Sequence, residues 1–265
     1  MEASLNQQVA IVTGGDSGIG RGICLAFARA GAQVVVNYHS SRDKADEVVE
    51  QIAAAGGKAI AVQCDVAQED DVARLFDEAV KAFGGVDILV ANSGIQKDAR
   101  FAEMSLADWQ AVIDVNLTGQ FLCARAAIKH FRRQGNRGRT RANGNILFMS
   151  SVHETIPWAG HVNYAASKGG VLMLMKSLAQ EVAPERIRVN GIAPGAVRTA
   201  INADVTEGED GKKLLELIPY GRIGHTDDVA PLALFMVSDL ADYMTGSTVT
   251  IDGGMQLYPG FEDNG

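Results

Sequence analysis

The stretch Val9-Ala-Ile-Val-Thr-Gly-Gly-Asp-Ser-Gly-Ile-Gly20 runs from a short apolar segment through a glycine-rich turn into a helical pattern. Four consecutive apolar residues, Val9–Val12, are typical of a strand that is buried on both faces. Gly31 suits the C-terminal cap of the helix that follows. Beyond the turn, apolar residues recur at helical spacing: Ile19, Ile23, Phe27 and Ala30.

A strand, a glycine turn and a helix in this order form the layout of a dinucleotide site. Glycine lets the backbone approach a pyrophosphate, and the N-terminus of the helix faces the negative charge. The spacing of Gly14, Gly18 and Gly20 is Gly-x-x-x-Gly-x-Gly, which differs from the more common Gly-x-Gly-x-x-Gly. Taken alone, the stretch is therefore also compatible with an ordinary tight turn.

The alternation of strands and helices continues to the end of the chain. Further strands are expected at 34–36, 59–62, 86–90, 145–149, 188–191 and 247–251. Helices are expected near 43–55, 69–83 and 106–131, around Tyr164 with its end before Pro184, and from Thr226. Repeated units of this length predict an α/β, Rossmann-type, doubly wound parallel sheet of about seven strands with helices on both faces. We expect a single domain over residues 1–265.

Composition and charge exclude several classes of protein. The chain has 265 residues, of which 47% are hydrophobic, and a formal net charge of −8. This balance disfavours disorder, nucleic acid and anionic membranes, and no apolar run reaches the ~18 residues of a membrane span. The first residues lack the pattern of a signal peptide, so a cytoplasmic location is expected, with Cys24, Cys64 and Cys123 as reduced thiols. The five histidines show no ligand-like pairing, and no metal is expected.

Polar or small residues follow several of the expected strands. Ligands of open parallel sheets bind at the carboxyl ends of the strands, so these residues are candidates for a common site. Each could also be an ordinary polar loop residue. They are Asp65 and Val66 after the third strand, Asn92 and Gly94 after the fourth, Ser151 after the fifth, and Pro194 and Gly195 after the sixth.

Tyr164 and Lys168 are four residues apart in an expected helix, so their side chains lie on one face. A phenol is a poor base at neutral pH, and an ammonium group beside it stabilises the phenolate. Ser151 lies thirteen residues upstream and offers a hydroxyl that can hold a substrate oxygen. The spacing alone also fits a solvated helix face, so its weight depends on the other motifs.

Together these motifs resemble the short-chain dehydrogenase/reductase family. The likeness runs from about residue 7 to the C-terminus and rests on Thr13-Gly-x-x-x-Gly-Ile-Gly20, Asn92-Ser-Gly94, Asn116, Ser151, Tyr164-x-x-x-Lys168 and Pro194-Gly195. The resemblance implies hydride transfer between a substrate carbon and a nicotinamide. It implies that Tyr164 is the general acid or base, that Lys168 lowers the pKa of Tyr164 and holds the nicotinamide ribose, and that Ser151 orients the substrate. Asn116 would anchor a water of the proton relay.

The resemblance also implies a set of cofactor-binding residues and a homotetramer. NADP is the expected cofactor, with NAD tolerated, because the second strand is followed by no carboxylate before Asp43. Asp16 in the glycine loop favours NAD instead, since its charge would repel the 2′-phosphate of NADP. The implied cofactor residues are Gly14, Asp16, Ser17, Gly18, Ile19, Gly20, Tyr38, His39, Ser40, Asp65, Val66, Asn92, Gly94, Tyr164, Lys168, Pro194, Gly195, Val197 and Thr199.

The substrate is expected to be a small molecule, namely a sugar, a polyol or a ketone. Within the family the chain is most similar to the glucose 1-dehydrogenase branch, although Gln96 stands where that branch has glutamate. Polar groups beside an aromatic wall suit a sugar or polyol. The His153-Glu154 pair could instead simply pack in a loop. The expected substrate residues are Gln96, Ser151, His153, Trp158 and Tyr164, with a substrate loop at about 196–220.

Two alternative functions remain compatible with these residues. The first is a carbonyl or 3-ketoacyl reductase of the same family. The second, a dinucleotide-binding redox sensor without turnover, is disfavoured because all four catalytic positions are present. Separately, the arginine-rich stretch 132–141 is interpreted as a solvated, mobile loop rather than a site for polyanions, because no aromatic residues are interleaved.

Overall fold

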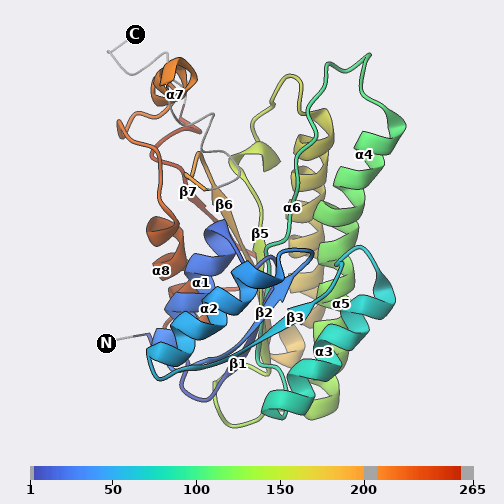
Figure 1. Cartoon of the computed structure of the whole chain (residues 1–265). Coiled ribbons are helices and arrows are strands. Elements are labelled where there is room, and N and C mark those ends of the chain that lie inside the picture. Colours follow the sequence, from blue (N-terminus) through green and yellow to red (C-terminus); the bar gives the residue numbers. More distant parts are fainter. Residues whose placement is uncertain (1–2, 200–207, 258–265) are drawn as a thin grey trace.

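The computed structural model describes residues 3–199 and 208–257 (Figure 1). Its centre is a parallel sheet of seven strands in the order β3-β2-β1-β4-β5-β6-β7. The predicted doubly wound parallel sheet is thereby confirmed. The strands are β1 Val9–Val12, β2 Gln33–Tyr38, β3 Lys58–Gln63, β4 Ile88–Ala91, β5 Gly144–Met149, β6 Ile187–Pro194 and β7 Thr248–Ile251.

Helices cover both faces of the sheet. One face carries α1 Gly18–Arg29, α2 Arg42–Ala54 and α8 Thr226–Val237, and the other carries α3 Glu69–Phe83, α4 Leu106–Ile113, α5 Gly119–Gln134 and α6 Val162–Val182 (Figure 1). Successive strand residues point to opposite faces, so Ile11 joins one core while Ala10 and Val12 join the other. This is why the strands are continuous apolar runs rather than alternating ones.

The carboxyl ends of the strands form one edge of the sheet, at the top of Figure 1. The chain leaves β1 toward one side and β4 toward the other, so a crevice is expected between these two strands. Helices α1 and α6 begin at this edge. The glycine turn before α1 and the Tyr164 turn of α6 are therefore brought to the same end of the molecule.

Two differences from the expected elements concern the site. The single long helix expected at 106–131 is divided into α4 and α5 by a π-helical turn, Asp114–Thr118, centred on Asn116. The expected substrate loop contains a further helix, α7 Gly208–Leu215. Residues 200–207 of that loop lie outside the described part of the chain. A π-turn is a single-turn feature within a helix, and the residues on either side keep a helical pattern, which is why the sequence did not reveal it.

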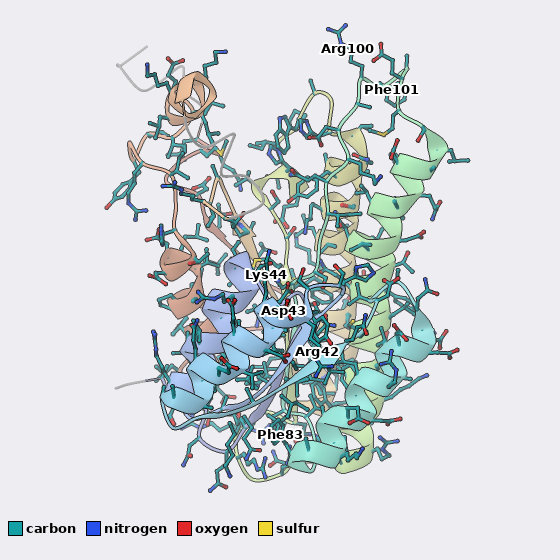
Figure 2. All side chains as sticks on the ribbon, viewed as in Figure 1. Arg42, Asp43, Lys44, Phe83, Arg100 and Phe101 are labelled. Carbon is teal, nitrogen blue, oxygen red and sulfur yellow. The ribbon has the colours of Figure 1, made fainter. Side chains whose placement is uncertain are left out.

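The arginine-rich stretch is anchored to the body of the protein, which corrects the expectation of a solvated, mobile loop. Helix α5 continues to Gln134, and beyond it Arg137 donates from Nη1 to Oδ2 of Asp87 at 2.9 Å. The Arg137 side chain is only 12% exposed and that of Asp87 only 4%. Asp87 also accepts from the backbone N–H of Val9 at 2.7 Å. The stretch therefore packs against the edge of the sheet at which the strands begin. The labelled Phe83 lies at this edge, and its carbonyl also accepts from Arg137 (Figure 2).

The three cysteines are all buried and unpaired. Burial raises the pKa of each thiol, to about 12 for Cys64. None of them is therefore a reactive thiolate at neutral pH. Over the described ranges, 3–199 and 208–257, no helix is long and apolar enough to cross a membrane.

Candidate active site

The glycine turn between β1 and α1 adopts a conformation that only glycine fits without strain. Gly14 and Gly18 have φ values of 59° and 52°. A Cβ at Gly20 would lie 2.1 Å from the carbonyl oxygen of Gly14. The backbone of the turn is thus free of side chains where the predicted pyrophosphate site lies, at the N-terminus of α1.

Asn37 holds this turn in place, a role that the sequence reasoning missed. Its Oδ1 accepts from the N–H of Gly14 at 3.1 Å. Its Nδ2 donates to the carbonyl of Cys64 at 3.1 Å, which ties the turn to the end of β3. The signal in the sequence was a polar residue directly after the apolar run Val34–Val36, since a polar side chain buried at the end of a strand needs a partner.

The loop after β4 joins the glycine turn to helix α6. Asn92 donates from Nδ2 to the carbonyl of Thr13 at 2.8 Å, and the Thr13 hydroxyl accepts from the N–H of Asn92 at 2.8 Å. Two residues on, a Cβ at Gly94 would lie 3.5 Å from Oδ1 of Asn116 and 3.7 Å from Nζ of Lys168. Residues of β1, β4, α6 and the π-helical turn therefore meet at one rim, as the motifs predicted.

Lys168 is fixed below the ring of Tyr164. Its Nζ donates to the carbonyl of Met149 at 2.9 Å and lies 5.5 Å from the centroid of the Tyr164 ring. Burial lowers the pKa of Lys168 to about 8, and the nearby Glu154 carboxylate acts in the opposite direction. The ammonium group is therefore held close to the phenol that it is expected to assist.

The Tyr164 hydroxyl faces two of the predicted substrate residues. Burial raises the pKa of Tyr164, and hydrogen bonding from the side chains of Ser151 and then Gln96 opposes that rise. Ser151 follows β5 in an extended conformation and is 6% exposed. Its Oγ also accepts from the N–H of His153 at 3.2 Å. Tyr164, Ser151 and Gln96 thus surround one point, where a substrate oxygen can be held.

Asn116 lies in the site, but its side chain is engaged with the loop after β4. Oδ1 accepts from the N–H of Ile95 at 2.8 Å, and Nδ2 donates to the Ile95 carbonyl at 3.0 Å and to Oγ of Ser167 at 3.2 Å. These contacts hold the loop that carries Gly94 and Gln96. The role in a water relay that the resemblance implied remains a prediction.

Asn163, another residue that sequence reasoning missed, fixes the start of helix α6. Its Oδ1 accepts from the N–H of Tyr164 at 2.8 Å, and its Nδ2 donates to the carbonyl of Lys97 at 2.8 Å. The residue is fully buried. It couples the position of Tyr164 to the loop that carries Gln96. An asparagine at the first turn of a helix was the available signal.

His153 and Trp158 lie beside Tyr164, together with His161. The Trp158 indole is stacked between the His153 ring at 4.3 Å and the His161 ring at 3.5 Å. Trp158 and His153 both meet the Tyr164 ring nearly at right angles, at 6.2 and 6.3 Å between centroids. Because both faces of the indole are covered, ring edges rather than a flat aromatic face are turned toward Tyr164.

Charged and polar residues at the end of β2 form the expected adenosine end of the site. Tyr38 is buried, whereas His39 and Ser40 are exposed. Figure 2 shows Arg42, Asp43 and Lys44 together at the N-terminus of α2. Arg42 is paired with Asp46 at 3.2 Å.

Asp16, in the glycine turn, is under the electrostatic influence of Lys44. Burial raises the pKa of Asp16, and the charge of Lys44 acts against this rise. The charge of Lys44 therefore acts on the carboxylate that was expected to repel a 2′-phosphate, which the sequence reasoning did not identify. Ser17 and Ile19 lie in the same turn and in the first turn of α1.

The remaining predicted cofactor residues lie along the same rim. Asp65 follows β3 and accepts from the N–H of Ala67 at 3.0 Å, while Val66 is buried next to it. Pro194 ends β6, and a Cβ at Gly195 would come within 2.7 Å of Asp252 Cβ. A Cβ at Gly18 would lie 3.2 Å from Thr199 Cγ2, and Val197 bridges to Gly224. The segment after β6 thus returns to the glycine turn.

These residues fit a dinucleotide. The turn has no side chain at Gly14, Gly18 and Gly20, the wall at Gly94 is open beside Lys168, and a helix N-terminus faces the site. Over the described residues, no group of three or more His, Cys, Asp or Glu side chains is placed to hold a metal ion.

Comparisons with known proteins agree with this geometry. A family model described as enoyl-(acyl carrier protein) reductase matches residues 14–256. The 3beta-hydroxysteroid dehydrogenase 1 of Eggerthella lenta is 46% identical, covering 99% of this chain and 98% of that protein. Glucose 1-dehydrogenase 2 of Bacillus subtilis is 45% identical, covering 98% of each. The 3-oxoacyl-[acyl-carrier-protein] reductase of a Synechocystis species is 42% identical, covering 96% of this chain and 99% of that protein.

Solved structures of similar dehydrogenases have the same fold as this chain. A short-chain type dehydrogenase/reductase from Mycobacterium marinum has a TM-score of 0.89 at 36% identity, covering 96% of this chain and 98% of that one. A 7 alpha-hydroxysteroid dehydrogenase complexed with NADH and 7-oxo glycochenodeoxycholic acid has a TM-score of 0.88 at 34% identity, covering 95% of each chain. A short chain dehydrogenase from Burkholderia cenocepacia in complex with NADP has a TM-score of 0.87 at 34% identity, covering 95% and 98%.

The chain therefore belongs to the short-chain dehydrogenase/reductase family, as its motifs predicted. It is an NAD(P)-dependent oxidoreductase that acts on CH–OH groups. The three relatives are named for a steroid, a sugar and an acyl-carrier-protein substrate, so family membership leaves the substrate open.

Proposed function

We propose that the protein oxidises a sugar or polyol carbon, with reduction of NADP in preference to NAD. The observation that carries this proposal is the polar environment of the Tyr164 hydroxyl, which faces the side chains of both Ser151 and Gln96. A substrate with several hydroxyl groups can use both side chains, because one can hold the reacting oxygen and the other its neighbour. The similarity to a glucose 1-dehydrogenase supports the same substrate class.

In this proposal four residues perform the protein's part of the reaction. Tyr164 takes the proton from the substrate hydroxyl, and Ser151 holds that oxygen while the proton moves. Lys168, fixed on the Met149 carbonyl, stabilises the phenolate of Tyr164. Asn116 fixes the Ile95 backbone and so the loop that carries Gln96. The bound nicotinamide supplies the hydride acceptor.

The preference for NADP is supported by the charges at the adenosine end. No carboxylate ends β2, and the labelled cluster at the start of α2 contains Arg42 and Lys44 (Figure 2). Arg42 forms an ion pair with Asp46, whereas the charge of Lys44 lowers the pKa of Asp16. We infer that Lys44 offsets the charge of Asp16 and allows a 2′-phosphate to bind. His39 and Ser40, at the end of β2, are the proposed polar neighbours of that phosphate.

A homotetramer is proposed for the assembled enzyme. Phe121 on α5 is 42% exposed and Met173 on α6 is 59% exposed, so these two helices carry apolar side chains on their outer sides. Tyr243, ahead of β7, is fully exposed. Such residues favour contacts with further copies of the chain. Light scattering after size exclusion tests this proposal, and a monomeric mass at micromolar concentration would contradict it.

The substrate proposal is tested by following reduced nicotinamide absorbance with NADP or NAD, against aldoses, polyols and hydroxysteroids. Rapid reduction of the cofactor when D-glucose or another sugar is added supports the proposal. The second candidate, a carbonyl or 3-ketoacyl reductase, is favoured by the similarity to a 3-oxoacyl-[acyl-carrier-protein] reductase. Oxidation of NADPH by ketoacyl thioesters, with no reaction of any sugar or polyol, would replace the first candidate by the second.

A further inference from the structure

The short helical turn Val152–Glu154, which we call the Glu154 turn, packs against helix α6 at the residue that follows Lys168. The N–H of Glu154 donates to the carbonyl of Ser151 at 2.9 Å, which closes the turn. A Cβ at Gly169 would lie 3.8 Å from the carbonyl oxygen of Glu154, so the turn and the helix are in direct contact. Glu154 is therefore fixed where α6 carries the lysine.

The ammonium group of Lys168 shares its acceptor with another donor. Lys168 is only 3% exposed, and its Nζ donates to the carbonyl of Met149 at 2.9 Å. The same carbonyl accepts from Nε2 of Gln120 at 3.3 Å. An ammonium group has three N–H donors, so one shared carbonyl replaces only part of the hydration that burial removes. The buried charge needs further stabilisation from its surroundings.

Buried oxygens gather around this carbonyl. Among the residues that the structure describes, Oε1 of Gln120, Oγ of Ser150 and Oε2 of Glu154 are buried and have no hydrogen-bond partner. Gln120 contacts the Met149 carbonyl through its amide, and Ser150 follows Met149 in the chain. A buried oxygen without a donor is unfavourable by itself, but its negative partial charge stabilises a cation in the same low-dielectric surroundings. The polar groups around Lys168 therefore favour a positive charge.

Glu154 and Lys168 also act on each other through their charges. Burial lowers the pKa of Lys168 to about 8, and the charge of Glu154 opposes that fall. Burial raises the pKa of Glu154, and this rise is opposed by the Ser150 side chain, whose geometry falls short of a hydrogen bond, and by the charges of Lys176 and Lys168. Each of the two charges favours the ionised form of the other.

Other titratable groups near this pair come from helix α6, the Glu154 turn and β6. On α6, Lys176 is exposed, and the Tyr164 ring centroid lies 5.5 Å from the ammonium nitrogen. On the turn, burial lowers the pKa of His153 from 6.5, so this ring is neutral where the lysine titrates. On β6, Arg188 donates to the carbonyl of Ser238 at 3.0 Å, toward the α8 side. The carboxylate of the turn is thus the anion that acts on the lysine.

We propose that Glu154 is a positioning residue, which acts through Lys168 by holding its ammonium group protonated and fixed on the Met149 carbonyl. When a hydroxyl is oxidised, the hydride goes to the nicotinamide and a proton is released through Tyr164, so alkaline pH favours the proposed direction of the reaction. With Glu154 as its counter-charge, the lysine keeps the charge that stabilises the Tyr164 phenolate to higher pH. The consequence for turnover rests on the proposed function, whereas the link between the two side chains does not.

The link is tested by a double-mutant cycle that is measured as stability against pH. The stability of the parent relative to Lys168→Met should rise from about pH 8 toward pH 10.5, because the unfolded chain keeps the proton longer than the folded one. In a Glu154→Gln background the same difference should begin to rise at a pH about 0.5 to 1 lower, because the pKa of the folded lysine falls further. Urea unfolding between about pH 6.5 and 10.5 measures both differences, in which the contributions of thiols and phenols cancel.

Two control variants separate charge from shape. Glu154→Asp keeps the negative charge on a shorter side chain and should return the onset toward that of the parent. Glu50→Gln removes the same charge from an exposed position on α2 and should leave the onset unchanged. The link is overturned if Glu154→Gln leaves the onset unmoved, or if Glu50→Gln moves it equally. These measurements need no substrate, so their outcome is independent of whether the enzyme acts on a sugar.

The positioning role is tested by the pH profile of kcat/KM with the substrate that the absorbance assay identifies. Without the negative charge, Lys168 and Tyr164 both lose their protons more easily, so the alkaline limb of Glu154→Gln should move to lower pH. Above that limb kcat/KM should fall about three- to tenfold, the change that corresponds to a pKa lower by about 0.5 to 1. The acid limb should not move to higher pH. An unmoved profile, or an equal loss at every pH, would overturn the positioning role.

Discussion

Lys168 donates from Nζ to the backbone carbonyl of Met149 at 2.9 Å, and this carbonyl belongs to the last residue of the strand that leads to Ser151. One hydrogen bond thus sets the position of the ammonium group relative to both the Tyr164 ring and the Ser151 hydroxyl. Lys168 is almost fully buried, and burial lowers its pKa to about 8. A charge held in this way has consequences for both stability and catalysis.

Replacing Lys168 with methionine should raise the stability of the free protein at pH 7 while removing activity. The folded state has the lower pKa, about 8 against 10.5, so burial of the charge costs stability below pH 8. Between these values only the unfolded chain retains the proton, and stability rises with pH. Lys168→Met should lack this rise and should gain about 1 kcal/mol or more at pH 7. Urea unfolding at fixed protein concentration, between pH 7 and 10, measures both effects. An equally steep pH dependence in the variant would contradict the assignment.

Tyr164→Phe should remove turnover and leave cofactor binding nearly intact. The phenol is the only proton donor or acceptor that the proposal assigns to the substrate oxygen, and loss of such a group costs about 100- to 10,000-fold in kcat. The ring itself remains, so the contacts with His153 and Trp158 are preserved. Steady-state kinetics and cofactor titration by fluorescence provide the two measurements. Activity within tenfold of the parent would show that another group moves the proton.

Gly20→Ala should abolish dinucleotide binding. The added Cβ would lie 2.1 Å from the Gly14 carbonyl oxygen and 2.7 Å from Nδ2 of Asn92, so the turn must change shape. Gly56→Ala is the matched control, because Gly56 has a φ of 81° but an added Cβ there would meet no atom within 4 Å. The control carries only backbone strain of about 1 kcal/mol and should bind cofactor normally. Isothermal titration calorimetry with NADP compares the affinities of the two variants. Equal affinities would show that the pyrophosphate does not bind at the glycine turn.

Lys44→Glu should reverse the proposed preference for NADP. It removes the cation that offsets Asp16 and adds a second negative charge at the adenosine end. The ratio of kcat/KM for NADP to that for NAD should fall about tenfold or more. Asp16→Asn should change the ratio in the opposite direction. Lys58→Glu, an exposed charge reversal at the start of β3, is the control and should leave the ratio unchanged. If the ratio is unaltered in Lys44→Glu, Lys44 has no role in cofactor selection.

Arg137→Ala should destabilise the fold by about 3 kcal/mol, because it leaves the Asp87 carboxylate buried without its nearest cation. Burial raises the pKa of Asp87, so its protonated form is favoured in the folded chain and stability falls as pH rises through its titration. Without Arg137 this fall is larger, and the deficit should be greater at pH 8 than at pH 5. Arg133→Ala, at an exposed position beside His130, should cost less than about 0.5 kcal/mol. Equal losses in the two variants would contradict the anchoring role of Arg137.

Local patterns were sufficient to predict the sheet and much of the rim. Continuous apolar runs predicted strands buried on both faces, and β1 and α3 have the expected bounds. The glycine turn and the Tyr164–Lys168 spacing each depend on neighbours along the chain, so the sequence contains the information directly. This is why the motifs at Gly14, Gly20, Tyr164 and Lys168 can be recognised from the sequence alone.

Features that depend on contacts between distant segments were not predictable in the same way. The arginine-rich stretch was interpreted as solvated because its partner, Asp87, lies 50 residues upstream. Asn37, which holds the glycine turn, pairs across 23 residues, and Asn163 pairs across 66. The stacking of Trp158 between two histidines depends on loop conformation, which no periodicity records. In each case the sequence shows the residue type but not its partner.

The burial of Cys24, Cys64 and Cys123 makes the chain a convenient host for site-specific labels. None of these thiols is accessible or ionised at neutral pH, so a maleimide dye would react with an introduced cysteine alone. Arg100, at the outer end of the loop after β4, and Tyr243, which is fully exposed, are suitable positions for a dye pair. Energy transfer between them would report the distance from the loop after β4 to the β7 side of the enzyme in single molecules, with no background from the native cysteines.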